Sequence, residues 1–362
     1  MTADRPAAIL HAPADVGGNA YGLSRAEREL GLVSDVAVFS PGPLGYGYDL
    51  DLRAGIEQPV WLRLGRRAAF LRRAVRRYDV FHFNFGLTLL TVRQLGRVAD
   101  ELALLRRLGK TVLVTYQGCD VRPKASCPCR RPGCLATHQY RQPAANRALR
   151  YANRVFFLNP DLRHWLPGAR FVPYASVDPR ELLQVPPPDG DELVVAHAPT
   201  DRDVKGTAHV IAAVEALRRE GVSVRLDLIE DAIHGEALSR LAAADLVVDQ
   251  LVLGWYGAVA VEAMALGRPV LAYIREDEPD DNPFGSKLPI VRTTAETLLA
   301  DLRVLAVDRA ARHALGAAGR GFVEEEHDPR RIARTVLDDL VRIPDEAATP
   351  ASAQGLSARA PR

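Results

Sequence analysis

The chain has 362 residues, of which 48% are hydrophobic, and its formal net charge is +2 at neutral pH. This size and composition predict a globular protein of two domains. The small net charge argues weakly against a nucleic-acid partner, because contacts to a nucleic-acid backbone usually show as a large basic excess on one domain. The N-terminus has no signal-peptide pattern and no apolar run is long enough to span a bilayer, so we expect a cytoplasmic protein.

Short apolar runs alternate with longer amphipathic runs along the whole chain. In the first half we expect strands at residues 7–12, 35–40, 79–85, 111–118 and 154–159, and helices at 20–31 and 89–110. In the second half we expect strands at 193–198, 224–230, 245–252 and 270–274, and helices at 207–221, 236–244 and within 254–270. Such alternation is typical of parallel sheets with helices on both faces.

Changes in composition divide the chain into segments. The expected order is an N-terminal Rossmann-like domain (1–172) with a cysteine-rich insertion (119–138), a Pro-rich and acidic linker (173–192), a C-terminal Rossmann-like domain (193–322), a closing helix (323–343) and a disordered tail (344–362). The fold class is therefore α/β, with two doubly wound domains facing each other across a cleft. In such sheets ligands bind at the carboxyl ends of the strands.

Two cations precede a helix in the first strand-to-helix turn of the second domain. Arg202 and Lys205 stand just ahead of a helix that Thr207 can cap. Backbone N–H groups and the helix dipole favour anions at such a position, so this turn is a candidate diphosphate site. The alternative is a solvated basic turn.

A single carboxylate, Glu262, lies in the apolar stretch "GWYGAVAVEAMALGRPV". Gly254 and Gly257 allow the backbone to approach a ligand, and Ala258 begins a helix on which Glu262 lies one turn later, on the same face. A buried carboxylate must be paired or hydrogen-bonded. The hydroxyls of a ribose would satisfy it, and a structural salt bridge to Arg268 is the alternative.

Several motifs together resemble one enzyme family. "HAPTDRDVKGT" and "AAADLVVDQLVLGWYGAVAVEAMALGRPVLAYI" are similar to the C-terminal domain of the family-4 retaining glycosyltransferases of GT-B fold. In the first half the similar motifs are "GG" at Gly17 and Gly18, "DVFHFN" from Asp79, and "PYASVD" from Pro173. The resemblance extends to about Asp328.

The resemblance implies a donor site for a nucleoside-diphosphate sugar. Lys205 and Arg202 would hold the diphosphate and Glu262 the ribose. The turn at Gly17 and Gly18 would approach the phosphate and sugar from the opposite domain. It also implies catalysis without a metal cofactor, on an acceptor that the sequence does not identify.

The chain departs from the family at two positions. The family carries a sugar-contacting glutamate eight positions before Glu262, and this chain has Gly254 there. Where the family often has a sugar-contacting histidine, the segment "QGCD" has Gln117, which cannot shuttle a proton at neutral pH. The expected catalytic residues are Gln117, Asp120 and His82.

These departures keep two other functions open. One is a catalytically impaired protein that only binds a nucleotide sugar, and the other is a nucleotide-sugar epimerase of the same fold. The epimerase is less well supported, because we find no spacing that pairs acid and base residues at the sugar. Measuring hydrolysis of a nucleotide sugar, or transfer of its sugar, would distinguish these functions.

A basic segment near residue 70 suggests contact with an anionic membrane. Seven arginines lie between Arg63 and Arg77. At helical spacing the apolar face consists of Phe70, Leu71, Ala74 and Val75, flanked by Arg66, Arg73 and Arg77. Such a helix suits the inner face of a membrane that carries a lipid-linked acceptor. An ordinary surface helix packed on the sheet is the alternative.

All four cysteines, Cys119, Cys127, Cys129 and Cys134, lie in the insertion, with His138 just after them. A reducing compartment disfavours disulfides, which leaves metal ligation or free thiols. Four thiolates, or three with His138, could close a tetrahedral zinc site that folds the loop. C-x-C is not the usual zinc-ribbon spacing, so free or redox-sensitive thiols remain the alternative.

Overall fold

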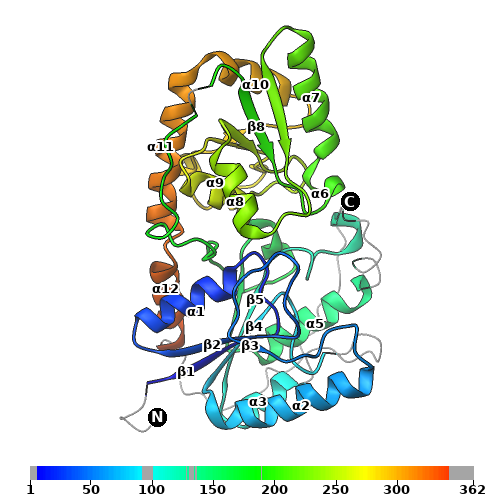
Figure 1. Cartoon of the computed structure of the whole chain (residues 1–362). Coiled ribbons are helices and arrows are strands. Elements are labelled where there is room, and N and C mark those ends of the chain that lie inside the picture. Colours follow the sequence, from blue (N-terminus) through cyan, green and yellow to red (C-terminus); the bar gives the residue numbers. More distant parts are fainter. Residues whose placement is uncertain are drawn as a thin grey trace.

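The computed structural model describes residues 6–91, 101–127, 129, 134, 137–188 and 190–341. Within these residues the chain forms two α/β domains, with the N-terminal domain at the bottom of Figure 1 and the C-terminal domain at the top. Each domain is built on a parallel sheet, as the alternating runs predicted. Among the helices described, none has the length and apolarity that crossing a lipid bilayer requires.

The N-terminal sheet has seven strands in the order β3-β2-β1-β4-β5-β6-β7. These are β1 (Ala8–Ala12), β2 (Val33–Val38), β3 (Leu50–Asp51), β4 (Val80–Asn84), β5 (Thr111–Tyr116), β6 (Arg154–Phe157) and β7 (Arg170–Phe171). The helices are α1 (Asn19–Glu29), α2 (Val60–Arg77), α3 (Glu101–Arg107) and α5 (His138–Tyr151), with 3-10 turns η2 (Lys124–Ser126) and η3 (Pro160–His164). Successive side chains alternate across the sheet. Leu10 and Phe81 therefore join the core under α2, α3 and α5, and Ile9 packs on the opposite side.

The C-terminal sheet has five strands in the order β12-β11-β10-β8-β9. These are β8 (Leu193–His197), β9 (Val224–Leu228), β10 (Leu246–Val248), β11 (Val270–Ala272) and β12 (Val291–Arg292). The helices are α6 (Arg202–Lys205), α7 (Thr207–Arg219), α8 (His234–Ala242), α9 (Ala258–Ala265), α10 (Leu298–Val307) and α11 (Arg309–Glu326), with a 3-10 turn η4 (Gly285–Lys287). β7 ends at Phe171 and β8 begins at Leu193, so the segment 172–192 connects the last strand of the N-terminal sheet to the first strand of the C-terminal sheet.

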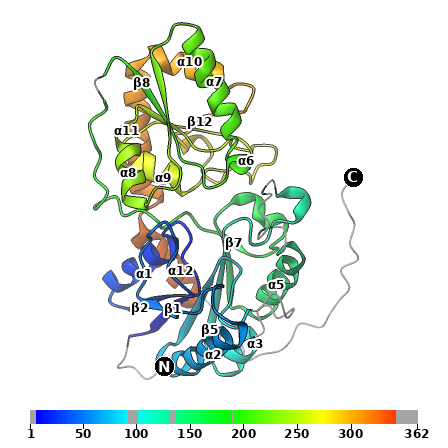
Figure 2. The same cartoon turned by 45° about the vertical axis from the view of Figure 1, so that its right-hand side comes forward.

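The last described helix, α12 (Pro329–Val341), returns to the N-terminal domain. Ile332 and Ala333 of α12 share a buried cluster with Leu23 and Ala26 of α1, and both views of the molecule show the two helices together (Figures 1 and 2). The expected closing segment 323–343 thus contains the end of α11 as well as α12. The tail 344–362 and residues 92–100 of the helix expected at 89–110 lie outside the described residues; residues 89–91 are not helical, and α3 covers Glu101–Arg107.

The apolar face of α2 is not available to a membrane. Phe70, Leu71 and Ala74 are buried against the sheet, which corrects the interpretation of this face as a membrane contact. Two of the seven arginines, Arg63 and Arg67, are buried with them, and Arg67 donates hydrogen bonds to the carbonyl oxygens of Ala54 (2.7 Å) and Thr91 (3.1 Å). The segment therefore folds as a surface helix packed on the sheet.

Candidate donor-binding site

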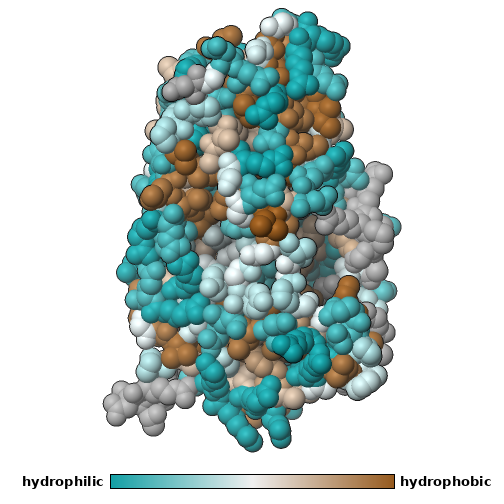
Figure 3. Space-filling model, in the orientation of Figure 1, coloured by the Kyte–Doolittle hydropathy of each residue, from teal (hydrophilic) through white to brown (hydrophobic). Residues whose placement is uncertain are grey.

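The carboxyl ends of both parallel sheets face the junction between the domains. The loop after β1 reaches the start of α9, where a Cβ atom on Gly17 would lie 3.3 Å from the Cβ atom of Ala258. The loop after β2 also crosses the junction, because the backbone N–H of His234 donates to the carbonyl oxygen of Leu44 (2.9 Å). In Figure 3 pale residues of intermediate hydropathy gather across the middle of the molecule, where Figure 1 shows these blue loops.

A cavity of about 600 Å³ opens at this junction, and most of its wall belongs to the C-terminal domain. The loop after β8 and the loop after β9 form two sides, α8 and α9 form a third, and Tyr46 closes it from the N-terminal domain. Apolar side chains in the wall are Ile229, Ala237, Leu241 and Val259, and Glu262 is its buried carboxylate. The volume and the mixture of apolar walls with a few polar groups suit a small organic ligand.

Glu262 is 3% exposed and lies on the second turn of α9. Its partner is the imidazole Nε2 of His234 at 2.8 Å, whereas Arg268 donates to the carbonyl oxygens of Val185 and Pro186. The alternative of a salt bridge between Glu262 and Arg268 is therefore wrong. The hydrogen bond to Glu262 raises the pKa of His234 above its ordinary value.

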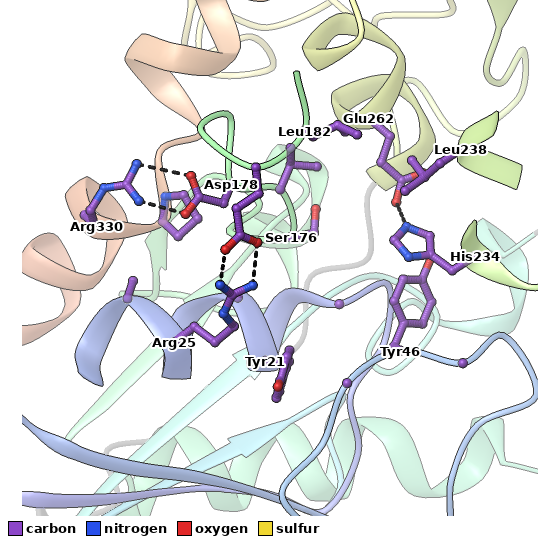
Figure 4. A pocket seen from close by; sticks show the side chains of 18 of the residues that line it. Tyr21, Arg25, Tyr46, Ser176, Asp178, Leu182, His234, Leu238, Glu262 and Arg330 are labelled. Carbon is purple, nitrogen blue, oxygen red and sulfur yellow. Dashed lines mark hydrogen bonds and ion pairs between the residues drawn. The ribbon is translucent and has the colours of Figure 1, made fainter. Parts of the chain in front are cut away.

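Tyr46 completes a column with these two side chains. Its ring centroid lies 4.7 Å from that of His234, and Figure 4 shows Tyr46, His234 and Glu262 in a row. All three line both the larger cavity and a second cavity of about 350 Å³. The column thus stands between the two cavities. In the smaller cavity Arg25 is paired with Glu181, and Arg330 with Asp178.

Lys205 is 9% exposed and its ammonium group is held by Asp249, the first residue after β10. The other carboxylate oxygen of Asp249 accepts a hydrogen bond from the backbone N–H of Gly257 at 2.6 Å. One carboxylate therefore joins the cation of α6 to the N-terminus of α9, and a Cβ atom on Gly257 would lie 3.0 Å from the Nζ atom of Lys205. Of these groups, Lys205 was expected to hold a diphosphate together with Arg202, and Gly257 was expected to let the backbone approach the ligand. The strand expected at 245–252 ends early, at Val248, where this turn begins.

Arg202 differs from Lys205 in its surroundings. It lines the larger cavity, but its exposed guanidinium forms two hydrogen bonds with Glu230. The expected cap of α7 by Thr207 is not present, because Gly206 occupies that position and the hydroxyl of Thr207 bonds to the buried His197 at 2.9 Å. Asp201 instead caps α6 by accepting from the N–H of Val204 at 3.0 Å.

Gly17 and Gly18 both have left-handed backbone conformations, with φ of 65° and 73°. Glycine adopts this conformation without strain, which explains the "GG" pair at the start of α1. Asp15 precedes them and accepts a hydrogen bond from the N–H of Ala20 at 2.9 Å through one oxygen. Its other oxygen is buried without a hydrogen-bond partner among the described residues. Burial raises the pKa of Asp15 to about 6.

The glycine at position 254, where the family that the sequence resembles carries a glutamate, has a structural explanation. Gly254 has φ of 69°, and a Cβ atom there would lie 2.9 Å from the Cβ atom of Arg275. The next two side chains are buried away from the cavity: Trp255 stacks on Phe284, and the hydroxyl of Tyr256 bonds to His327 at 3.0 Å. The turn before α9 thus anchors aromatic side chains and has no room for a side chain at residue 254.

The three expected catalytic residues differ in how they are held. Gln117 follows β5 at the carboxyl edge, and its buried Nε2 has no hydrogen-bond partner in the described part of the chain. Both oxygens of Asp120 accept from the backbone N–H of Gln117, so this carboxylate organises the turn. His82 lies in the middle of β4 and bonds to the hydroxyl of Thr115 at 2.7 Å. Burial lowers the pKa of His82 well below its ordinary value. None of the three lines either cavity.

The four cysteines do not form one cluster. The Sγ atoms of Cys119, Cys127 and Cys134 lie within 4.8 Å of one another. Cys129 is not part of this group, and its Sγ lies 3.6 Å from a carboxylate oxygen of Asp201. The expectation of a four-cysteine site is therefore corrected to three cysteines. Residues 128, 130–133, 135 and 136 of the insertion lie outside the described residues.

Two partners in this site were not expected from the sequence. His234 lies 28 positions before Glu262, and Asp249 lies 44 positions after Lys205. His234 begins the helix α8 that follows β9, and Asp249 follows the buried strand β10. For Asp249 the available signal was a polar residue directly after a strand, whereas His234 lies six positions after the end of β9 and had no such signal.

No protein-family model matches the chain, and no curated protein matches it. Solved structures do. A sucrose-phosphate synthase from Thermosynechococcus elongatus is 20% identical over 93% of this chain and 98% of its own, with a TM-score of 0.64. HepE from Anabaena in complex with UDP-glucose is 15% identical over 92% of this chain and 98% of its own, with a TM-score of 0.59. The trehalose-6-phosphate synthase OtsA is 11% identical over 93% of this chain and 99% of its own, with a TM-score of 0.58.

These likenesses cover nearly the whole chain and confirm the predicted GT-B fold, with two Rossmann-like α/β domains facing across a cleft.

Proposed function

We propose that the chain is a retaining, family-4-like glycosyltransferase that takes a sugar from a nucleoside-diphosphate sugar. The observation that carries this proposal is the cavity of about 600 Å³ at the carboxyl ends of the C-terminal strands, with Glu262 in its wall. A structure of the same fold, HepE, was solved with UDP-glucose. In our proposal the base lies against Ile229 and Leu241, and the ribose hydroxyls donate to Glu262.

The diphosphate would then bind at the N-terminus of α9. The backbone N–H of Gly257 and the ammonium of Lys205 point at one carboxylate, Asp249, so an anion is already the preferred neighbour of both groups. When the bond between the sugar and the diphosphate breaks, negative charge grows on the diphosphate. The helix N-terminus and Lys205 would stabilise that charge.

In the proposed reaction the acceptor hydroxyl oxygen forms the new bond to the anomeric carbon as the bond to the diphosphate breaks. The acceptor proton passes to an oxygen of the leaving diphosphate, because Gln117 cannot take it. In our proposal the Nε2 of Gln117, which has no hydrogen-bond partner among the described residues, donates to a sugar hydroxyl. The configuration at the anomeric carbon is retained, which NMR of the product would test.

The experiment is a thermal-shift screen with UDP-, GDP- and ADP-sugars, followed by an assay for sugar transfer and hydrolysis. A donor at 100 times its Kd stabilises the protein by about 2.7 kcal/mol. Glu262→Ala should weaken binding by about 1.5–3 kcal/mol, the range for a hydrogen bond to a charged group. Glu220→Ala is the matched control, because Glu220 is paired with Arg303 on the surface of the same domain.

If no nucleotide sugar stabilises the parent, or if Glu262→Ala binds as tightly as the parent, the donor site is wrong. Binding without transfer or hydrolysis would instead favour the catalytically impaired nucleotide-sugar-binding protein.

A further inference from the structure

The three clustered cysteines come from three separate points of the insertion. Cys119 follows β5, Cys127 follows η2, and Cys134 precedes α5. None of them is in a disulfide, and the Sγ atoms of Cys119 and Cys127 are 3.7 Å apart. A tetrahedral zinc ion with Zn–S bonds of about 2.3 Å requires sulfur atoms about 3.8 Å apart. We propose that Cys119, Cys127 and Cys134 bind one zinc ion through their three thiolates.

A disulfide explains this arrangement less well. It would use two of the sulfur atoms at a separation of about 2.0 Å and leave the third thiol with no role. A metal ion uses all three, and the cluster already has the spacing of a tetrahedral site to within about 1 Å at its widest pair, 4.8 Å.

The charges around the cluster also favour a bound cation with thiolate ligands. Three thiolates and one divalent ion together carry one negative charge. The guanidinium of Arg141 supplies the matching positive charge and donates a hydrogen bond to the Sγ atom of Cys134 at 2.8 Å. The same Arg141 holds the loop by donating to the carbonyl oxygens of Arg122 (3.0 Å) and Cys134 (3.2 Å). Partners of this kind orient metal ligands and tune their basicity.

The fourth position of the site is assigned to water. His138 lies four positions after Cys134; its Nδ1 faces Arg141 at 3.0 Å, its Nε2 is buried without a hydrogen-bond partner among the described residues, and it is not one of the clustered ligands. Three protein ligands with an open fourth position are a known arrangement for zinc.

The zinc site would connect the insertion to the donor side of the cleft. Cys129, two residues after Cys127, lies against Asp201, and the other oxygen of Asp201 caps α6. Figures 1 and 2 show this teal part of the chain between α6 and α5. A metal ion that fixes Cys127 therefore fixes the contact with the helix that carries Lys205. This second step rests on the proposed function, because it assigns Lys205 to the donor.

The first test is the metal content of the full-length chain purified without chelator. We expect about one equivalent of zinc in the parent, and a loss of zinc in Cys119→Ser, Cys127→Ser and Cys134→Ser. Cys129→Ser is the matched control, because this thiol is in the same insertion but outside the cluster, and it should keep the zinc. Less than about half an equivalent in the parent, or equal zinc in all four variants, would overturn the site.

A second measurement covers variants that fail to fold. The parent is loaded with cobalt(II), which should produce a thiolate-to-metal charge-transfer band that zinc then abolishes. Mass spectrometry of the parent without reductant should show four thiols. A disulfide between Cys119 and Cys127, or a cobalt spectrum without the thiolate band, would contradict the proposal.

The connection to the donor site has its own readout. Removing zinc with a chelator should weaken UDP binding several-fold, and restoring zinc should recover it. Unchanged UDP affinity on zinc removal would overturn the connection while the metal site stands, and zinc binding without any nucleotide binding would refute the proposed function alone.

Discussion

The two sides of the cleft hold their buried polar groups in different ways. On the C-terminal side the buried charges of Lys205 and Glu262 each have a protein partner: Lys205 is paired with Asp249, and Glu262 with His234. On the N-terminal side Gln117 and Asp15 each keep one buried polar atom without a hydrogen-bond partner in the described structure. A ligand on the C-terminal side must therefore compete with existing pairs, whereas a ligand that reached Gln117 or Asp15 would gain new hydrogen bonds.

The difference follows from the cost of burying charge. An ionised group taken out of water needs a partner inside the protein, whereas a neutral amide tolerates a missing partner at a smaller cost. The carboxyl group of Asp15 is intermediate, since burial raises its pKa to about 6 and so favours its neutral form. The pairs Lys205–Asp249 and His234–Glu262 therefore occupy the hydrogen-bonding groups that a ligand would use. Each pair can be removed separately by a substitution.

The largest effect is expected for Lys205→Ala. This change leaves the fully buried carboxylate of Asp249 without its cation, which should destabilise the protein by about 3–5 kcal/mol. It should also weaken nucleoside-diphosphate binding by about 1.5–3 kcal/mol. Chemical denaturation and calorimetric titration with UDP measure the two losses.

Asp249→Asn and Lys287→Ala sharpen that test. Asp249→Asn frees the ammonium of Lys205 from a competing carboxylate, so UDP should bind at least as tightly as to the parent. Lys287→Ala removes an exposed lysine paired with Glu325 and should change neither quantity. Parent-like UDP binding by Lys205→Ala would remove this residue from the donor site.

Restoring the family glutamate with Gly254→Glu should destabilise the protein. The left-handed backbone at residue 254 and the nearby Cβ atom of Arg275 both oppose a side chain, and together we expect a loss of about 1–3 kcal/mol without a gain in activity. Gly31→Glu is the control for backbone strain alone, because Gly31 has φ of 86° and open space around it. If Gly254→Glu is as stable as the parent, the turn before α9 is not built as described.

Asp15→Asn should stabilise the protein at pH 7 by about 1–3 kcal/mol, because it removes a carboxyl whose burial disfavours the charged form. The folded-state pKa of about 6 is above the ordinary value of 3.8, so the parent loses stability as the pH rises through this window. The advantage of the variant should therefore be absent near pH 4 and complete above pH 6. Denaturation at a series of pH values would show it, and an advantage that does not vary with pH would contradict the assignment.

The sequence predicted the fold better than it predicted which side chains pair with Glu262 and Lys205 in the candidate site. Alternating runs predicted the long strands of both sheets, but β3, β7 and β12 have two residues each and are too short to show a period. Glu262 and Lys205 lie in short sequence motifs, and those motifs alone were enough to predict them as site residues. Their partners are 28 and 44 positions away, so the pairs depend on how the loops after β9 and β10 meet in the folded chain.

The cysteines show the same limit. Crowding of all four into one insertion predicted a cluster, but no spacing rule could show that Cys129 points to Asp201 of the other domain while the rest gather. Likewise, the apolar positions of α2 predicted a helix with one apolar face, for which a membrane contact and packing on the sheet were both open. Only the folded structure shows that this face packs on the sheet.

The smallest effect is expected for His234→Gln, which keeps a hydrogen-bond donor for Glu262 but removes the titratable charge. Because the bond to Glu262 raises the pKa of His234 in the folded protein, the charged pair stabilises the parent fully below the ordinary histidine pKa of about 6.5. That stabilisation is lost as the pH rises through the raised folded-state value. His234 is only partly buried, so solvent screening limits the difference between parent and variant to about 0.5–1 kcal/mol at pH 5.5. Denaturation of both proteins from pH 5.5 to 9 should show this difference shrinking with pH, and a difference that grows would mean that Glu262 does not hold the imidazolium.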